Sequence, residues 1–163
     1  MSAVRVYVPS TLSRLADLVA SGGVGPAPLL GHAVTDALRE AWPEVGEEEW
    51  EYAALTAAAR DSVGLLTDED APRRVVVALD AATARPVDGA GPTLVEVDEV
   101  VPLRRVASVH VDSAEAAETV VAAREAWAAA EGGDEAAEAV VDRCEDHELG
   151  WYAVQEADAL LAG

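Results

Sequence analysis

Lysine, isoleucine, phenylalanine and asparagine are absent from this 163-residue sequence, and cysteine occurs once, at Cys144. A single cysteine excludes an intrachain disulfide and any metal site built from several thiolates of one chain. No apolar run approaches the ~20 residues that a membrane-spanning helix needs. The first residues lack the charged and apolar regions of a secretory signal peptide, so we expect a cytoplasmic protein without membrane association.

Positive charge is scarce as well. Eleven arginines face 31 carboxylates, which leaves a formal net charge of −20. A surface this acidic repels nucleic-acid phosphates, so we expect no direct nucleic-acid binding. Residues 112–163 hold 14 acids against two arginines and therefore carry −12 of this charge. This acidic third is either a solvated face or a mimic of nucleic acid that binds a basic partner.

The residues that are present describe a folded protein. Apolar residues make up 51% of the chain, mostly alanine, valine and leucine, which excludes a disordered acidic tail. The four missing residue types all have A/T-rich codons, a bias that indicates a high-G+C genome. A halophile, whose charged surface stays solvated in brine, is the alternative.

Hydrophobic periodicity predicts alternating strands and helices. We expect strands at 4–8, 31–34, 74–79, 93–101, 106–111 and 149–154, and helices at 12–21, 35–42, 47–66, 112–130, 134–145 and 155–161. This order predicts an α/β (α+β) fold: a single-domain layered sandwich over residues 1–163, with helices on a mixed sheet of five or six strands. Residues 81–92, rich in alanine, proline and glycine, are expected to form a flexible loop.

Two details of this pattern carry specific expectations. The apolar run at 74–79 is typical of a strand buried on both faces. In the helix at 47–66, Tyr52 and Val63 lie on one apolar face, so we expect both to be buried. Asp112 and Glu115 have the spacing of a capping box at the start of the following helix.

No motif in the chain specifies a reaction. The Asp146-His147-Glu148 triplet contains a histidine between two acids, but no HExxH spacing accompanies it, and we expect neither a metal nor a cofactor. His110 precedes Asp112 at the end of a strand, and Cys144 lies among acids that raise the pKa of a thiol. The alternative to each of these sites is a structural or solvated side chain.

A collective site is a further hypothesis. If the first, second and last strands are neighbours, five polar side chains converge on one place. These weak candidates for a binding site are Tyr7, His32, Arg39, His147 and Glu148.

Several segments together resemble a known family. They are RVYVP (5–9), GPAP (25–28), HAVT (32–35), ALRE (37–40), EYAAL (51–55), PRRVVV (72–77), VHVD (109–112), EDHEL (145–149), WYA (151–153) and QE (155–156). They resemble a family of uncharacterised small acidic proteins of high-G+C actinobacteria. The resemblance covers nearly the whole chain and implies no activity, because the family has no assigned function.

Three functions therefore stay open. We favour a binding or regulatory module that acts through contacts with an unknown protein partner or as a homodimer. The first alternative is a small enzyme or ligand-binding protein with a polar site around His147, although the sequence does not decide whether the protein is an enzyme. The second alternative is the acidic mimic of nucleic acid.

Overall fold

A seven-stranded sheet forms the centre of the protein in the computed structural model, which describes residues 3–162. The strands are β1 (Val4–Ser10), β3 (Leu29–His32), β4 (Val75–Ala81), β5 (Arg85–Pro86), β6 (Leu94–Val97), β8 (Val106–Val111) and β9 (Gly150–Tyr152). Their order across the sheet is β5-β6-β3-β1-β4-β8-β9. A separate ribbon pairs β2 (Gly23–Val24) with β7 (Val101–Pro102).

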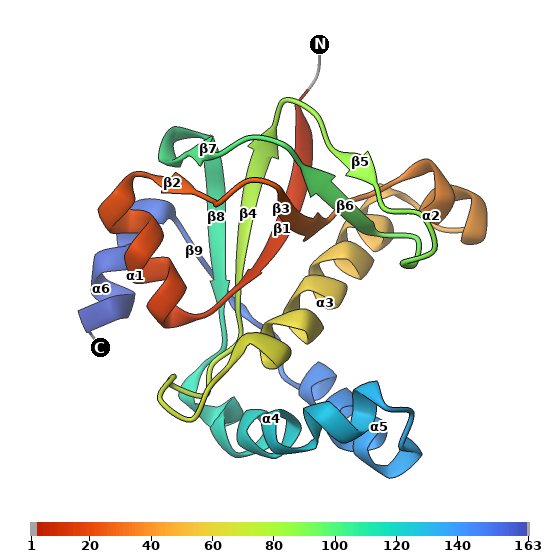
Figure 1. Ribbon diagram of the computed structural model, residues 1–163, viewed down its shortest axis with the longest axis vertical. Coiled ribbons are helices and arrows are strands. Elements are labelled where there is room, and N and C mark those ends of the chain that lie inside the picture. Colours follow the sequence, from red (N-terminus) through yellow and green to blue (C-terminus); the bar gives the residue numbers. More distant parts are fainter. Residues whose placement is uncertain (1–2, 163) are drawn as a thin grey trace.

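Helices lie around this sheet in layers (Figure 1). They are α1 (Leu12–Ser21), α2 (Asp36–Ala41), α3 (Glu47–Leu65), α4 (Ala117–Glu131), α5 (Glu135–Asp142) and α6 (Ala157–Ala162). α1 and α6 share one apolar cluster with the sheet, and α3 packs on the opposite face. α4 and α5 form a hairpin against the end of α3. None of the helices in residues 3–162 has the length and apolarity required to cross a membrane.

The layered α/β fold is confirmed, but the sheet differs from the expected one in two ways. It contains seven strands rather than five or six, and every registered pair in it is antiparallel rather than mixed. The connection between β8 and β9 shows why. The α4–α5 hairpin reverses the chain within itself, so the chain returns at the end where it left, and Val111 pairs with Gly150. Helices between strands therefore do not act as parallel crossovers here.

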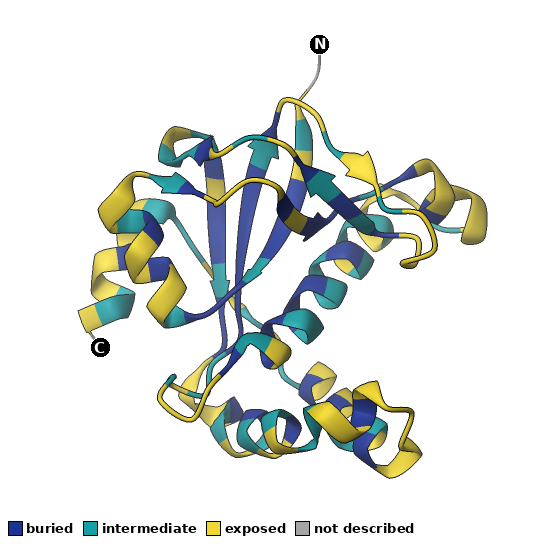
Figure 2. Cartoon of the chain, viewed as in Figure 1, coloured by how far each residue is buried: buried dark blue, intermediate teal, exposed yellow. Residues whose placement is uncertain are grey.

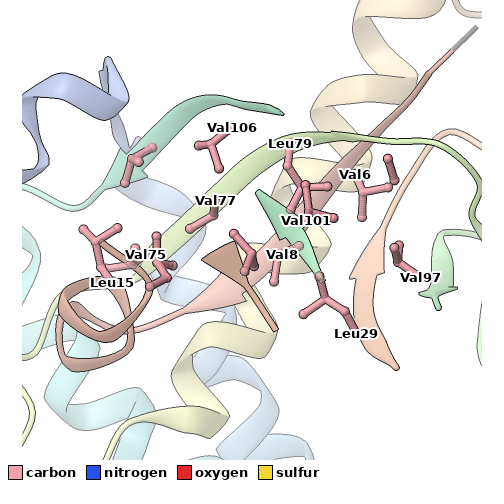
Figure 3. Packing of buried hydrophobic residues seen from close by; sticks show 14 of the residues in the cluster. Val6, Val8, Leu15, Leu29, Val75, Val77, Leu79, Val97, Val101 and Val106 are labelled. Carbon is pink, nitrogen blue, oxygen red and sulfur yellow. The ribbon is translucent and has the colours of Figure 1, made fainter. Parts of the chain in front are cut away.

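The main core lies between the sheet and α1. Along β4, Val75, Val77 and Leu79 point into this cluster, while Val76 and Ala78 point toward α3. β4 is thus buried on both faces, as the apolar run at 74–79 predicts, and the central strands are dark in Figure 2. Figure 3 shows Val75 and Val77 near Leu15 of α1, with Val8 of β1 beside them. Full burial of one such side chain contributes about 1.5–3 kcal/mol.

The opposite face is thinner, because α3 contacts it through small residues. Ala54, Ala58 and Ala59 are buried there, and Tyr7 and Val76 are the larger buried side chains of the cluster. Tyr52 is 56% exposed, so the expectation that it is buried is wrong. Tyr52 lies two residues before Ala54, a rotation of about 200° around the helix, so its ring points away from the sheet.

The predicted capping box at Asp112 is absent. The side chain of Asp112 is fully buried and accepts hydrogen bonds from Arg74 instead of capping the helix that follows. Side-chain caps are present elsewhere: Thr11 caps α1, Thr35 caps α2 and Asp134 caps α5. Residues 81–92 contain the edge strand β5. Its pairing with β6 continues one residue further, because the Val87 amide donates a hydrogen bond to the Leu94 carbonyl. The flexibility of this loop stays a prediction.

Candidate functional site

Two of the five candidate residues lie opposite each other in the sheet. Tyr7 of β1 and His32 of β3 are register partners, so both side chains are on the face that α3 covers. His32 is buried and held at both ring nitrogens: Nε2 lies 2.6 Å from a carboxylate oxygen of Asp61, and Nδ1 lies 2.8 Å from the hydroxyl of Thr93. A carboxylate only accepts, so Nε2 donates to Asp61, and Nδ1 forms its hydrogen bond with the Thr93 hydroxyl.

This Thr93–His32–Asp61 arrangement contains the residue types of a nucleophile, a base and an acid. The exposure of the two end groups is the opposite of what catalysis needs. The Thr93 hydroxyl is buried, while the Asp61 carboxylate is half-exposed. A nucleophile needs access to the substrate, whereas the acid orients the base from behind. We therefore interpret the three residues as a link between β3, the segment before β6 and helix α3.

Arg39 occupies a different position from His32. Together with Tyr7 it lines a cleft of about 370 Å³, where Glu47 and Glu51 are also present. Arg39 contacts the carboxylates of Asp36 and Glu47 and lies 5.4 Å from the ring centre of Trp50. Burial raises the pKa of Tyr7, and the nearby Glu51 carboxylate raises it further. The phenol is therefore a neutral group at physiological pH rather than a general base.

His147 and Glu148 line a third cleft, next to Tyr52 and Leu149. Its volume is about 150 Å³, below the roughly 300–1,000 Å³ of typical ligand pockets. Nε2 of His147 lies 3.1 Å from the Thr119 hydroxyl. The backbone carbonyl of His147 accepts a hydrogen bond from the Arg74 guanidinium. His147 is thus used in fixing the chain between α5 and β9.

The five candidates do not meet in one site. β9, which follows His147 and Glu148, is separated from β1 by β4 and β8. Tyr7 and His32 are brought together, Tyr7 shares a cleft with Arg39, and His147 lies beside Glu148 elsewhere. Within residues 3–162, no cluster of three or more histidine, cysteine or carboxylate side chains is arranged to hold a metal ion.

The sequence did not predict the buried ion pair between Arg74 and Asp112. Arg74 is 3% exposed and donates from Nε and Nη2 to the two carboxylate oxygens of Asp112, each at 2.8 Å. Burial alone lowers the pKa of Arg74, but the Asp112 carboxylate outweighs this effect and raises it. Arg74 directly precedes β4 and Asp112 directly follows β8, so the ion pair joins these two strands at the end of their pairing. The RRVVV and VHVDS patterns each place a charge at a strand end, which is the signal that could have paired them.

His110 belongs to a second polar pair. Its Nε2 lies 3.0 Å from the hydroxyl of Ser108, two residues back on β8. Burial lowers the pKa of His110, and the charge of Arg5 lowers it further, which favours the neutral imidazole. Cys144 is buried too, and burial raises the pKa of its thiol, as expected. Neither group has the open surroundings of a reactive nucleophile.

The two most exposed aromatic residues within residues 3–162 are Trp151 of β9 and Tyr52 of α3. α3 packs mainly on β1, β3 and β4. On β9, Trp151 is the register partner of His110, so its ring projects from the same face of the sheet, and it is 63% exposed. Leu149 lies two residues back and lines the small cleft together with Tyr52. We call Tyr52, Leu149, Trp151 and His110 the Tyr52–Trp151 surface.

Carboxylates border this surface. Glu145 and Glu148 line the cleft that holds Tyr52 and Leu149, and both are exposed. Apolar rings surrounded by charged groups are the composition of a protein-binding surface, with aromatic residues at its centre and a polar rim. A substrate pocket has the opposite form, a concave apolar cavity with a few convergent polar groups.

Comparisons with known proteins give a family and no activity. No curated protein and no solved structure matches the chain significantly. A family model matches residues 4–161, which include every strand of the sheet. The chain therefore belongs to the family of unknown function DUF6912.

Proposed function

We propose that this protein is a binding module that docks a basic protein partner on the Tyr52–Trp151 surface. The observation that carries the proposal is the exposure of Trp151, at 63%, on a sheet face that no helix covers fully. Tryptophan and tyrosine are the residues most enriched among those that dominate binding energy. An exposed tryptophan on an edge strand offers such an anchor before any partner arrives.

The sign of the partner's charge follows from the charge of this chain. The net charge of −20 and the carboxylates at the border of the surface attract cations and repel acidic proteins. Complementary charge accelerates association and excludes like-charged competitors more than it adds affinity. A basic partner is therefore the one that this surface accepts.

The enzyme alternative has less support. His32 and His147 lie in different clefts, and the cleft at His147 has a volume of only about 150 Å³. The acidic mimic of nucleic acid is one form of the same binding proposal, in which the basic partner is a nucleic-acid-binding protein. The homodimer, the cytoplasmic location and the actinobacterial origin stay predictions.

Affinity capture with matched variants tests the proposal. Immobilised wild-type protein and Trp151→Ala are compared on lysate of the source organism, and captured proteins are identified by mass spectrometry. We expect a basic protein whose binding Trp151→Ala weakens by at least about 30-fold, because truncation of an anchor residue costs ~2 kcal/mol or more. Release by added duplex DNA would identify the partner as a nucleic-acid-binding protein.

Val100→Ala serves as the control. Val100 is 57% exposed and contacts the loop after β2, on the other side of the sheet. We expect this variant to capture the same protein as the wild type, with loss of capture as salt rises. Equal capture by wild type and Trp151→Ala would refute the docking surface.

A further inference from the structure

β1 and β3 are neighbours in the sheet, but they pair at one point only. Their single register pair is Tyr7 with His32, whereas β1 pairs with β4 along all seven of its residues. Gly31 explains the crossing, because a Cβ there would lie 2.5 Å from the Val6 side chain and 3.0 Å from the Tyr7 carbonyl oxygen. Beyond this close approach the two strands diverge, and Val8 and Pro9 have no partners in β3.

A groove lies where the strands diverge. It has a volume of about 520 Å³, and its walls come from both strands, the loop at residues 25–28, the end of α3 and Trp127 of α4. A second groove of about 570 Å³ runs along α1 and shares Pro9, Arg14 and Pro26 with the first. The two grooves are therefore adjacent, and Arg14 lines both. The volume of each groove is within the roughly 300–1,000 Å³ of ligand pockets.

Arg14 differs from most arginines of this acidic chain. Arg5, Arg39, Arg60, Arg74, Arg85, Arg105 and Arg124 all contact carboxylates. Within residues 3–162, the guanidinium of Arg14 makes no ion pair and no hydrogen bond. The pKa of Asp70 is lowered mainly by the hydrogen bond from Ser13 and further by those from Thr67, and the charge of Arg14 adds a smaller lowering without a direct contact. Arg14 thus presents an unused planar donor to the groove.

The other walls are apolar. Pro9, Leu30, Leu65 and Trp127 are among the residues that line the groove, and they offer surface on which a hydrophobic group can lie. The Trp127 ring is held in place by Gly64, since a Cβ there would approach its Cε2 atom to 2.5 Å. The indole is therefore a fixed wall rather than a mobile side chain, and an ordered wall costs a ligand less entropy on binding.

The charges in the groove restrict the ligand further. Asp61 lines the first groove and Asp17 the second, so carboxylates are present beside the single guanidinium. These carboxylates repel a dianion such as phosphate more strongly than an anion with a single negative charge. A guanidinium fork matches the two oxygens of a carboxylate in a bidentate contact.

We propose that the groove between β1 and β3 is a binding site for a small organic carboxylate that bears an aromatic or alkyl group. The carboxylate contacts Arg14, and the hydrophobic group lies against Trp127 and Pro9. This site is separate from the Tyr52–Trp151 surface, and the inference does not depend on the proposed function. A failure of one leaves the other unchanged.

NMR titration tests the site with defined probes. The probes are 3-phenylpropionate and octanoate, with 3-phenylpropanol and inorganic phosphate as comparisons, added to ¹⁵N-labelled wild-type protein. We expect saturable shifts in the amides of residues 8–14 and 25–32 with at least one carboxylate. The alcohol is expected to bind at least about tenfold more weakly than that carboxylate. No saturable shift at roughly 10 mM, above the ~1 mM Kd of a weak ligand, would overturn the proposal.

Two arginine variants separate a specific contact from general charge. Arg14→Met is expected to weaken carboxylate binding by about tenfold or more, because hydrogen bonds to charged groups are the strong ones. Arg104→Met is the control, since its guanidinium also lacks a carboxylate partner in residues 3–162 but lies outside both grooves. Equal loss in the two variants, no loss in Arg14→Met, or tighter binding of phosphate than of both carboxylates would each overturn the site.

Discussion

The buried contact between Arg74 and Asp112 gives the sharpest test of the fold. Asp112→Asn removes the negative charge and keeps the shape, so the amide oxygen still accepts from the Arg74 backbone N–H. The guanidinium of Arg74, 3% exposed, is then left without its counter-ion. Loss of one partner of a buried ion pair costs about 3–5 kcal/mol, far above the ~0–1 kcal/mol of an exposed pair.

The expected loss is large enough to measure by two methods. A cost of about 3–5 kcal/mol corresponds to a fall in Tm of roughly 6–20 °C for a chain of this length. Urea unfolding followed by circular dichroism gives the free energy directly, with the slope unchanged. Because Arg74 also donates to the His147 carbonyl, amide exchange in β9 is expected to accelerate.

Matched variants decide whether burial is the cause. Asp80→Asn breaks the half-exposed contact of Asp80 with Arg5 and is expected to cost less than about 1 kcal/mol. The double variant Arg74→Met/Asp112→Asn is expected to lose less than the sum of its single changes, since neither charge remains buried alone. Equal costs for Asp112→Asn and Asp80→Asn would refute the reasoning.

Two further predictions concern single positions. Gly31→Ala is expected to destabilise the protein by about 1–3 kcal/mol, because its Cβ would meet the Val6 side chain and a backbone oxygen; Gly132→Ala, at 3.4 Å from its nearest atom, is expected to be nearly neutral in the same urea assay. The lowered pKa of His110 means that the unfolded chain binds the proton more tightly, so stability falls as pH drops below about 6.5 toward the folded pKa. His110→Gln is expected to remove that part of the pH dependence, and an unchanged profile between pH 7.5 and 5 would contradict it.

Much of the fold was accessible from local patterns. A nearly continuous apolar run predicts β4. Threonines at positions 11 and 35 indicate where α1 and α2 begin. The directions of the strands were not accessible, because they depend on where a connection returns rather than on any residue within a strand. The reversal by the α4–α5 hairpin is a tertiary event, and only the pairing of Val111 with Gly150 reveals it.

The polar contacts were less predictable than the fold. Asp112 has the spacing of a capping residue, and local reasoning assigns it to the next helix, although Arg74 lies 38 residues away in the sequence and binds it. His32 was selected, but Asp61 and Thr93 were not, since nothing in a helix or a loop indicates which side chain faces a buried histidine. Partners separated by long stretches of chain are fixed by the packing of strands.

The central position of β1 has a consequence for synthesis on the ribosome. β1 is made before both of its neighbours, and Val4 finds its partner Ala81 only after helices α1, α2 and α3 have been made. The apolar cluster that β1 shares is completed later still, by Ala157 of α6. Such long-range pairing slows folding. We therefore expect the nascent chain to expose its valine-rich strand β1 until β4 and α6 have been made, and to fold in one cooperative step after that.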